Sequence, residues 1–354
     1  MDSTSLKIEK APFRKTSDGI EVDQFIMKNG MKVGEITYGR IIHFLTARDK
    51  NDYKDIVLGY DNLAQYEASD PYFRAIIGRY GNRIAGGKFD LNDEGYELAK
   101  NNGDNHLHGG LKGFDKVVWK AKKIIAENSA LIDLRYLSKD MEEGYPGNPE
   151  VKVTYTLDNN DQLTVNYEAN TDKTFIINLT QYSYFNLTGD FKNDILDYEM
   201  VINADSFLPV NSELIPTGKF QDVLGTPFDF RNSKTIRRDI NIIDDQLKNG
   251  LGYDHCWVLN DQIQRFRFVA SAHEPNSGRL LEKYSDEPGI QFYSGNFLVG
   301  TLPSKRGGNY NFRTGFCFEN QHFPDSPNQK NFPTVELNPS EKYFSKTLFK
   351  FSVR

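Results

Sequence analysis

The sequence predicts an all-β protein, built as a large sandwich or barrel with very little helix. Well over a dozen short β-type runs are separated by turn residues, and almost no segment has the 3.6-residue period of a helix. Aromatic residues make up 13% of the chain, and such rings favour strands. No composition shift, flexible linker or fixed-period repeat divides the sequence, so a single domain over 1–354 is expected.

The first half of the chain is expected to contain strands joined by tight turns. Residues 1–19 have no clear pattern and are interpreted as a lead-in. Asn29-Gly30 is a strong hairpin signal between runs at 20–27 and 31–38. A short helix is expected at 61–68, opened by Asp61. The other expected strands lie at 41–47, 117–125 and 130–137 and in hairpins at 87–99 and 151–169.

The second half begins with a long β-type run over 175–187 and continues with another at 195–204. Residues 211–231 are loop-like, and a second short helix is expected within 233–247. Further strands are expected near 253–260, 265–272, 279–284, 290–298, 313–319 and 341–353.

Charge and composition exclude several classes of function. The net charge is −6 and the isoelectric point is near 5.6, so the chain lacks the basic footprint of a nucleic-acid-binding protein. No long apolar run could cross a membrane, and residues 1–10 lack the apolar core of a signal peptide. Cys256 and Cys317 are too few for a disulfide framework or a Cys-based zinc site. We expect a cytoplasmic protein, a monomer, with neither membrane nor nucleic-acid partners.

Glu319 is the first candidate for chemistry. If 316–318 is extended, alternation places Cys317 and Glu319 on one face of the strand. Residues 320–339 have neither strand nor helix period and are rich in turn-forming residues. A carboxylate at such a strand-to-loop junction is a candidate general base, and the alternative is a surface glutamate at a strand end. Cys317 would then either line the same cleft or be a small buried hydrophobe.

Two motifs in the first third of the chain carry arginine, asparagine and histidine. In the segment 77–87, Asn82 lies between Arg79 and Arg83, and this combination can bind vicinal hydroxyls, a carboxylate or a phosphate, or form ion pairs. In the segment 101–110, His106 and His108 could ligate a metal, although no third ligand lies nearby in sequence. A neutral imidazole that donates to a sugar hydroxyl, or a capped loop histidine, fits the same pattern.

Three later motifs also present hydrogen-bonding groups at expected strand edges. In the run 177–187, strand parity would place Asn178, Thr180, Tyr182, Tyr184 and Asn186 on one face. Asp254 lies beside His255 and Trp257, and parity places Gln291 and Tyr293 on one face. Amides, hydroxyls and single acids without a metal cage or a nucleophile elbow suit a neutral, polyhydroxylated ligand.

Taken in order, the motifs resemble those of the aldose 1-epimerase family. They are GRYGNRIAGG (78–87), NHLHGG (105–110), NLTQYSYFNL (178–187), GYDHCW (252–257), PGIQFYSGN (288–296) and FENQHFPDSPNQKNFP (318–333). The resemblance implies a large antiparallel β-supersandwich that interconverts the α and β anomers of free aldohexoses such as galactose and glucose. It also implies that no cofactor and no metal is needed. By position, Glu319 matches the base, and the sugar-binding positions are Asn82, Arg83, His108, Asp254 and Gln291.

One position departs from the family pattern. The family has a histidine as catalytic acid where this chain has Tyr182. Free tyrosine has a pKa of about 10 and histidine about 6.5, so a phenol is poorly matched to acid catalysis at pH 7. Three interpretations follow: Tyr182 is the acid, with a pKa lowered by a neighbour such as Arg83; His106 or His255 reaches the ring oxygen; or the protein binds sugars with little activity. A hexose-phosphate epimerase is a further alternative, and it would require additional arginine or lysine side chains at the cleft to bind the phosphate.

Overall fold

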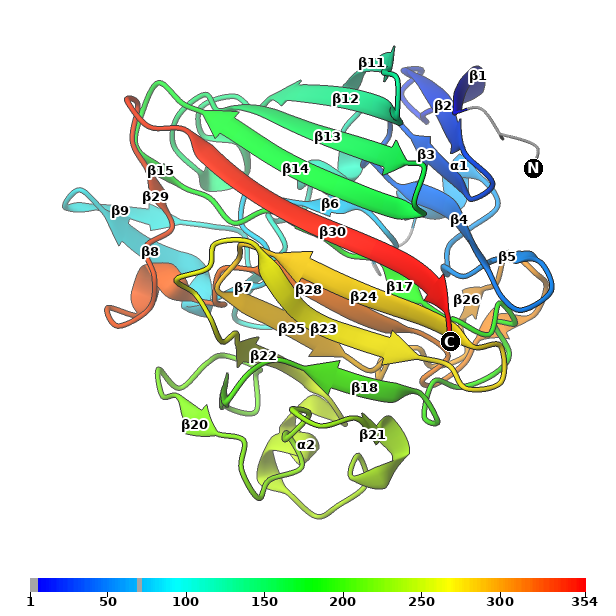
Figure 1. Cartoon of the computed structure of the whole chain (residues 1–354). Helices are drawn as coiled ribbons and strands as arrows, with labels where there is room; N and C mark the ends of the chain where they lie inside the picture. Colours follow the sequence, from blue (N-terminus) through cyan, green and yellow to red (C-terminus); the bar gives the residue numbers. More distant parts are fainter. Residues whose placement is uncertain (1–5, 69–71) are drawn as a thin grey trace.

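The computed structural model describes residues 6–68 and 72–354, and it confirms an all-β fold in which two large sheets face each other (Figure 1). The nine-stranded sheet has the order β11 (Lys120–Ile125), β12 (Ser129–Leu137), β13 (Glu150–Asp158), β14 (Gln162–Asn170), β30 (Tyr343–Val353), β24 (Arg279–Ser285), β23 (Arg267–His273), β18 (Glu199–Ile202) and β21 (Lys234–Thr235). The six-stranded sheet has the order β17 (Tyr184–Phe185), β28 (Phe316–Gln321), β25 (Gly289–Tyr293), β22 (Asp254–Val258), β19 (Ser206–Leu208) and β20 (Gln221–Asp222). All strand pairs within these two sheets are antiparallel.

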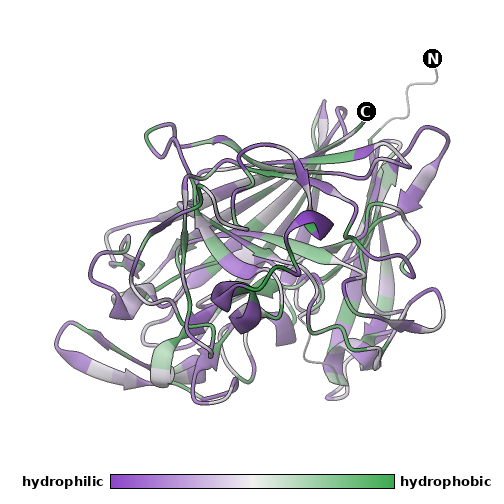
Figure 2. Ribbon diagram, turned by 90° about the horizontal axis from the view of Figure 1, so that it is seen from below, coloured by the Kyte–Doolittle hydropathy of each residue, from purple (hydrophilic) through white to green (hydrophobic). Residues whose placement is uncertain are grey.

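The hydrophobic core lies between these two sheets. Phe185 of β17 contacts Phe349 of β30, with ring centroids 5.9 Å apart, and both rings belong to the largest buried cluster. β30 contributes to the core because alternate residues of its eleven are buried, as period-two patterning requires. Figure 2 shows hydrophilic segments mainly in the loops and hydrophobic segments mainly along the strands. The expectation of a single domain stays a prediction. The nine-stranded sheet nevertheless joins segments as far apart as β11 and β30.

A five-stranded sheet near the N-terminus and several short pairs complete the fold. The five strands are β1 (Lys7–Lys15), β2 (Glu21–Lys28), β3 (Lys32–Ile36), β4 (Ile42–Arg48) and β5 (Tyr53–Asp55). The two-stranded pairs are β6 (Ile76–Ile77) with β16 (Thr180–Gln181), β7 (Arg83–Ile84) with β10 (His106–Leu107), β8 (Lys88–Leu91) with β9 (Glu94–Glu97), β15 (Phe175–Ile176) with β29 (Glu336–Leu337), and β26 (Leu302–Pro303) with β27 (Asn309–Tyr310). The interpretation of 1–19 as a lead-in was wrong for residues 7–15, which form β1 and pair along β2; residues 1–5 lie outside the described residues.

The turn signals were reliable. Lys28 pairs with Lys32 across Asn29-Gly30, and β13 pairs with β14 as expected. In the hairpin of β8 and β9, Asn92 and Asp93 have φ of 53° and 62°, the left-handed conformation that a two-residue turn needs.

The prediction of one long strand over 175–187 was wrong. The segment forms three two-residue strands, β15, β16 and β17, and each pairs with a different partner strand. Its side chains therefore do not share one alternating face. Asn178 donates to the carbonyl oxygens of Gly81 and His322, and Asn186 donates to those of Asn193 and Thr314. Both amides support the backbone instead of facing a cleft.

Helix is confined to short pieces in the described residues. The two α-helices are α1 (Leu63–Ala68) and α2 (Asp245–Gly250), which lie within or at the edge of the two expected helical segments. Asp244 caps α2 by accepting from the backbone N–H groups of Gln246 and Leu247. Among the residues described, no helix is long and apolar enough to cross a membrane.

Candidate active site

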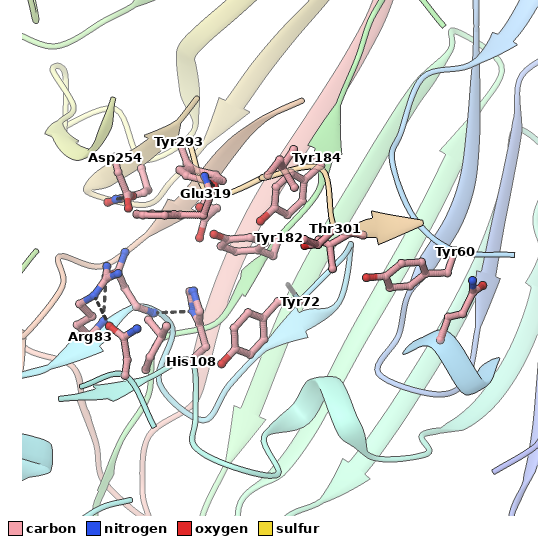
Figure 3. A pocket seen from close by; sticks show the side chains of 18 of the residues that line it. Tyr60, Tyr72, Arg83, His108, Tyr182, Tyr184, Asp254, Tyr293, Thr301 and Glu319 are labelled. Carbon is pink, nitrogen blue, oxygen red and sulfur yellow. Dashed lines mark hydrogen bonds between the residues drawn. The ribbon is translucent and has the colours of Figure 1, made fainter. Parts of the chain in front are cut away.

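The seven residues predicted for catalysis or sugar binding all line one cavity of about 690 Å³ (Figure 3). They are Asn82, Arg83, His108, Tyr182, Asp254, Gln291 and Glu319. They come from segments that are as much as 237 positions apart in the sequence. They form two walls that differ in their secondary structure. One wall belongs to the six-stranded sheet, and the other consists of loops and the short β7–β10 pair.

The sheet wall carries Glu319, Gln291 and Asp254 on three neighbouring strands. Gln291 of β25 lies directly opposite Glu319 of β28, and Asp254 begins the next strand, β22. Cross-strand partners project from the same face of a sheet, so strand register alone brings these side chains together. Gln291 Nε2 donates to Asp254 Oδ1 over 2.7 Å, which fixes the direction of that carboxyl group.

Glu319 is the most unusual ionisable group of this wall. Its side chain is 1% exposed, and neither carboxylate oxygen accepts a hydrogen bond from the described part of the chain. Burial, together with the neighbouring Asp254, raises the pKa of Glu319 well above its ordinary value, while Lys283 and Arg83 act in the opposite direction. A buried carboxylate of raised pKa is a stronger base than one in water, which suits proton abstraction.

The loop wall depends on a close contact between the segments 78–83 and 105–110. Arg83 pairs with Leu107 across β7 and β10, and Asn82 and His108 each have a positive φ, 68° and 53°. A Cβ added at Gly109 would lie 1.9 Å from the carbonyl oxygen of Gly78. The glycine after His108 is therefore needed for this contact as well as for its φ of 87°.

His108 is held as a neutral hydrogen-bond donor. The backbone N–H of Asn82 donates to His108 Nδ1 over 3.1 Å, so the neutral ring carries its proton on Nε2. Burial, followed by the charge of Arg83, lowers the pKa of His108 well below 6.5. Arg83 Nε donates in turn to Asn102 Oδ1 over 3.1 Å, which orients the guanidinium group. The wall thus presents donors of fixed geometry.

Tyr182 lies between the two walls, next to Glu319 in Figure 3. Its ring centroid is 4.9 Å from that of His108 and 5.3 Å from that of Tyr184. Burial raises the pKa of Tyr182 well above 10, and Tyr184 and Glu319 raise it further. The idea that Arg83 lowers this pKa was therefore wrong. The phenol stays protonated at neutral pH and reaches the cavity as a hydrogen-bond donor.

The other two histidines proposed as the acid do not line the cavity. His106 bonds through Nδ1 to the carbonyl oxygen of Ala99 and through Nε2 to the hydroxyl of Tyr145. His255 points to the opposite face of β22, with its ring centroid 4.7 Å from that of Phe228. Burial lowers their pKa values to about 4 and about 3. Both ring nitrogens of His106 are thus engaged, and His106 and His108 belong to no group of three potential metal ligands among the described residues.

Arg79 and Cys317 have structural positions. The Arg79 guanidinium donates to Ser138 Oγ and to the carbonyl oxygens of Tyr145 and Pro146, away from the cavity. Cys317 is fully buried among aromatic rings and does not line the cavity, as expected of a small hydrophobe.

The sequence did not indicate the far end of the cavity. Tyr60, Gln65 of α1 and the segment 297–303 line it. The sequence also did not indicate Tyr72, whose ring centroid is 4.7 Å from that of His108 and 6.1 Å from that of Tyr182. These residues follow no period and match no motif that we recognised. Asn102 was overlooked within a motif that had been singled out.

The whole chain resembles known aldose 1-epimerases. The family model for aldose 1-epimerase matches residues 23–350. Galactose mutarotase of Bos taurus is 45% identical over 334 residues, 94% of each chain, and aldose 1-epimerase of Escherichia coli (strain K12) is 35% identical over 91% of this chain and 92% of its own. The crystal structure of galactose 1-epimerase from Lactobacillus acidophilus NCFM superposes with a TM-score of 0.86, at 28% identity and 99% coverage of both chains. The chain belongs to the aldose 1-epimerase family.

Proposed function

We propose that the protein interconverts the α and β anomers of free aldohexoses, such as galactose and glucose, by acid–base ring opening. The observation that carries this proposal is Glu319, a buried carboxylate without a hydrogen-bond partner in the described chain, which faces a cavity lined by hydrogen-bond donors and acceptors such as Arg83 and Asp254. The relatives named galactose mutarotase and aldose 1-epimerase support it, because the chain matches them over more than nine-tenths of its length.

In the proposed reaction Glu319 takes the proton of the C1 hydroxyl. The electron pair of that O–H bond forms the C1 carbonyl, the bond between C1 and the ring oxygen breaks, and Tyr182 donates its phenolic proton to the ring oxygen. Rotation about the C1–C2 bond presents the other face of the aldehyde. Closure reverses both proton transfers, so acid and base return to their starting states.

The remaining residues of the set would hold the sugar. Arg83, Asn82 and the Nε2–H of His108 are donors to hydroxyl oxygens, and Asp254 is an acceptor whose direction Gln291 sets. Because these groups are ordered by hydrogen bonds to one another, little entropy is lost when a sugar binds.

Because the proposed acid is a phenol, we expect the reaction to be slower than with a histidine as the acid. A tyrosine whose pKa lies above 10 is a weaker acid at pH 7 than a histidine, and a well-matched general acid typically contributes about 10²–10⁴ in rate. Tyr182 is also the observation that favours a second candidate, a sugar-binding protein with little or no activity.

The cavity argues against a phosphorylated substrate. Arg83 is the single lysine or arginine among the described lining residues, and its Nε is engaged by Asn102. A phosphate carries close to two negative charges at pH 7 and is usually met by several charged or backbone donors. A neutral sugar needs no such cluster.

Polarimetry of freshly dissolved α-D-galactose and α-D-glucose tests the proposal. We expect anomer exchange faster than in buffer, and its loss in a Glu319→Gln variant. Exchange at the buffer rate, with sugar binding detected by calorimetry in the same sample, would establish the binding protein instead. Without exchange and without binding, both candidates fail.

We also propose that the protein acts as a cytoplasmic monomer without a nucleic-acid partner. Both cysteines are unpaired and buried, and the net charge of −6 does not favour a nucleic-acid partner. Light scattering on the purified protein tests the monomer, with a mass near 40.6 kDa expected.

A further inference from the structure

Lys283 is a buried lysine that the proposed reaction does not use. It lies on β24 in the nine-stranded sheet, and its side chain is 1% exposed. Nζ donates to the carbonyl oxygen of Phe318 over 2.6 Å and lies 4.4 Å from the centroid of the Phe349 ring. Among the described residues it forms no ion pair with a carboxylate, unlike the buried Lys234 and Lys305, which pair with Asp239 and Asp55. A buried ammonium without a contacting counterion is costly, and the charge of Glu319, when ionised, favours it.

The position of Lys283 relates it to Glu319. The carbonyl that accepts from Nζ belongs to the peptide bond between Phe318 and Glu319, so Nζ lies within roughly 5.5 Å of the Glu319 Cα. Phe318 faces the core and Glu319 faces the cavity, because successive residues of β28 alternate. Lys283 therefore stands behind the strand that carries the base and does not line the cavity.

We propose that Lys283 is a positioning residue whose charge, acting through β28, keeps Glu319 in the ionised form that the base requires. This inference rests on the proposed function. Lys283 is on the core side of the strand, so neither water nor a bound sugar comes between its ammonium and the strand. Its effect persists when the cavity is occupied, whereas Arg83 lies in the cavity and is engaged by the ligand.

The other groups that face Glu319 set the size of this effect. They are Asp254 and Cys256 of β22, Tyr293 of β25, Cys317 of β28, Tyr184 of β17, Tyr182 and the cation Arg83. The charges that face Lys283 are those of Glu319 and Cys317 when ionised. Asp254 disfavours ionisation of Glu319, whereas Lys283 and Arg83 favour it. At a charge separation of roughly 10 Å and an effective dielectric constant of about 20, one cation lowers a carboxyl pKa by about one unit.

The pH profile of kcat/KM in a Lys283→Met variant tests the proposal. Removing the cation raises the pKa of Glu319, so we expect the acidic limb to move to higher pH by about one unit. At a pH on that limb, kcat/KM should fall about tenfold while the alkaline plateau is unchanged. Lys283→Arg keeps the charge and should keep the limb in place. An acidic limb that does not move in Lys283→Met overturns the inference, even though Glu319 remains the base.

Lys234→Met is the matched control. Lys234 is also a buried lysine, with Nζ 2.6 Å from the Pro227 carbonyl oxygen and 4.1 Å from the Phe230 ring centroid, but it pairs with Asp239 and does not line the cavity. Its loss should lower stability without moving the limb. An equal shift in both variants would mean that a general loosening of the fold is the cause, and it would overturn the proposal.

A reciprocal measurement works even if Lys283→Met does not fold. In protein labelled at lysine Cε, the Lys283 signal is identified by its ring-current shift, which Phe349→Leu removes. Burial lowers the Lys283 pKa to about 7, and the charge of Glu319 holds it up. We therefore expect Lys283 to titrate at lower pH in Glu319→Gln than in the native chain. Identical titrations in the two proteins refute the coupling, whether or not the protein is an epimerase.

Discussion

The two walls of the cavity differ in how the chain builds them. The sheet wall places Glu319, Gln291 and Asp254 by strand register, because β25 pairs with β28 on one side and with β22 on the other. The loop wall places Asn82 and His108 by left-handed backbone conformations and by the close approach at Gly109. The sheet wall is a rigid support for the base, whereas the geometry of the loop wall depends on a few special residues. The proposed acid, Tyr182, lies at the junction of the two walls.

The largest effect should come from the sheet wall. Glu319→Gln keeps the shape of the side chain but removes the base, and we expect kcat to fall by about 10³ or more, or roughly 4 kcal/mol in the barrier. Polarimetry with α-D-galactose measures the rate, and calorimetry checks that the sugar still binds. A variant that kept a tenth of the native rate would place the base elsewhere.

Substitutions of Tyr182 should give the next largest effect, and they test whether the residue at the junction of the two walls is the proton donor. Tyr182→His supplies an acid whose pKa is better matched to neutral pH, and we expect a rate gain of about 10². Tyr182→Phe removes the proton donor, and kcat should fall by a similar factor while KM changes little. Full activity in Tyr182→Phe would show that another group donates the proton. The same polarimetric assay measures both variants.

One methyl group added at Gly109 should disrupt the packing of the loop wall. Gly109→Ala places a Cβ against the Gly78 carbonyl oxygen and strains a positive φ, so we expect a loss of about 2 kcal/mol or more in unfolding free energy and a higher KM. Gly103→Ala is the control, since Gly103 has a φ of 60° with no atom within 4 Å of the added Cβ. That change should cost only about 1 kcal/mol. Denaturant unfolding measures both; equal losses would contradict the close-approach argument.

The smallest expected effect is the pH response, to which the two walls contribute differently. Glu319 must be ionised, so kcat/KM should fall as the pH drops through its pKa, which lies above the ordinary value of 4.5. His108 stays neutral and Tyr182 stays protonated across the neutral range, so neither should add a limb between about pH 7 and 9. A pH–rate profile measures this. A bell shape centred near neutrality would assign an acid that titrates within that range.

Several structural features followed from the sequence alone. Turn chemistry predicted the hairpins at Asn29-Gly30 and at 87–99, and alternation predicted the face that carries Glu319. The family motifs identified seven residues that line one cavity, because such motifs keep the local backbone shapes of a site. The hairpins and the strand face are local features, so a short stretch of sequence contains the physical information that specifies them.

Only the tertiary structure decided how the distant groups meet. The run 175–187 has the composition of one strand, yet pairing with three different partners divides it into three, since tertiary hydrogen bonds override strand propensity. Burial, which no sequence pattern specifies, keeps His106 and His255 out of the cavity and raises the Tyr182 pKa. The position of Lys283 behind Glu319 depends on the packing of two sheets, because Lys283 and Phe318, which are 35 positions apart in the sequence, meet only in the folded chain.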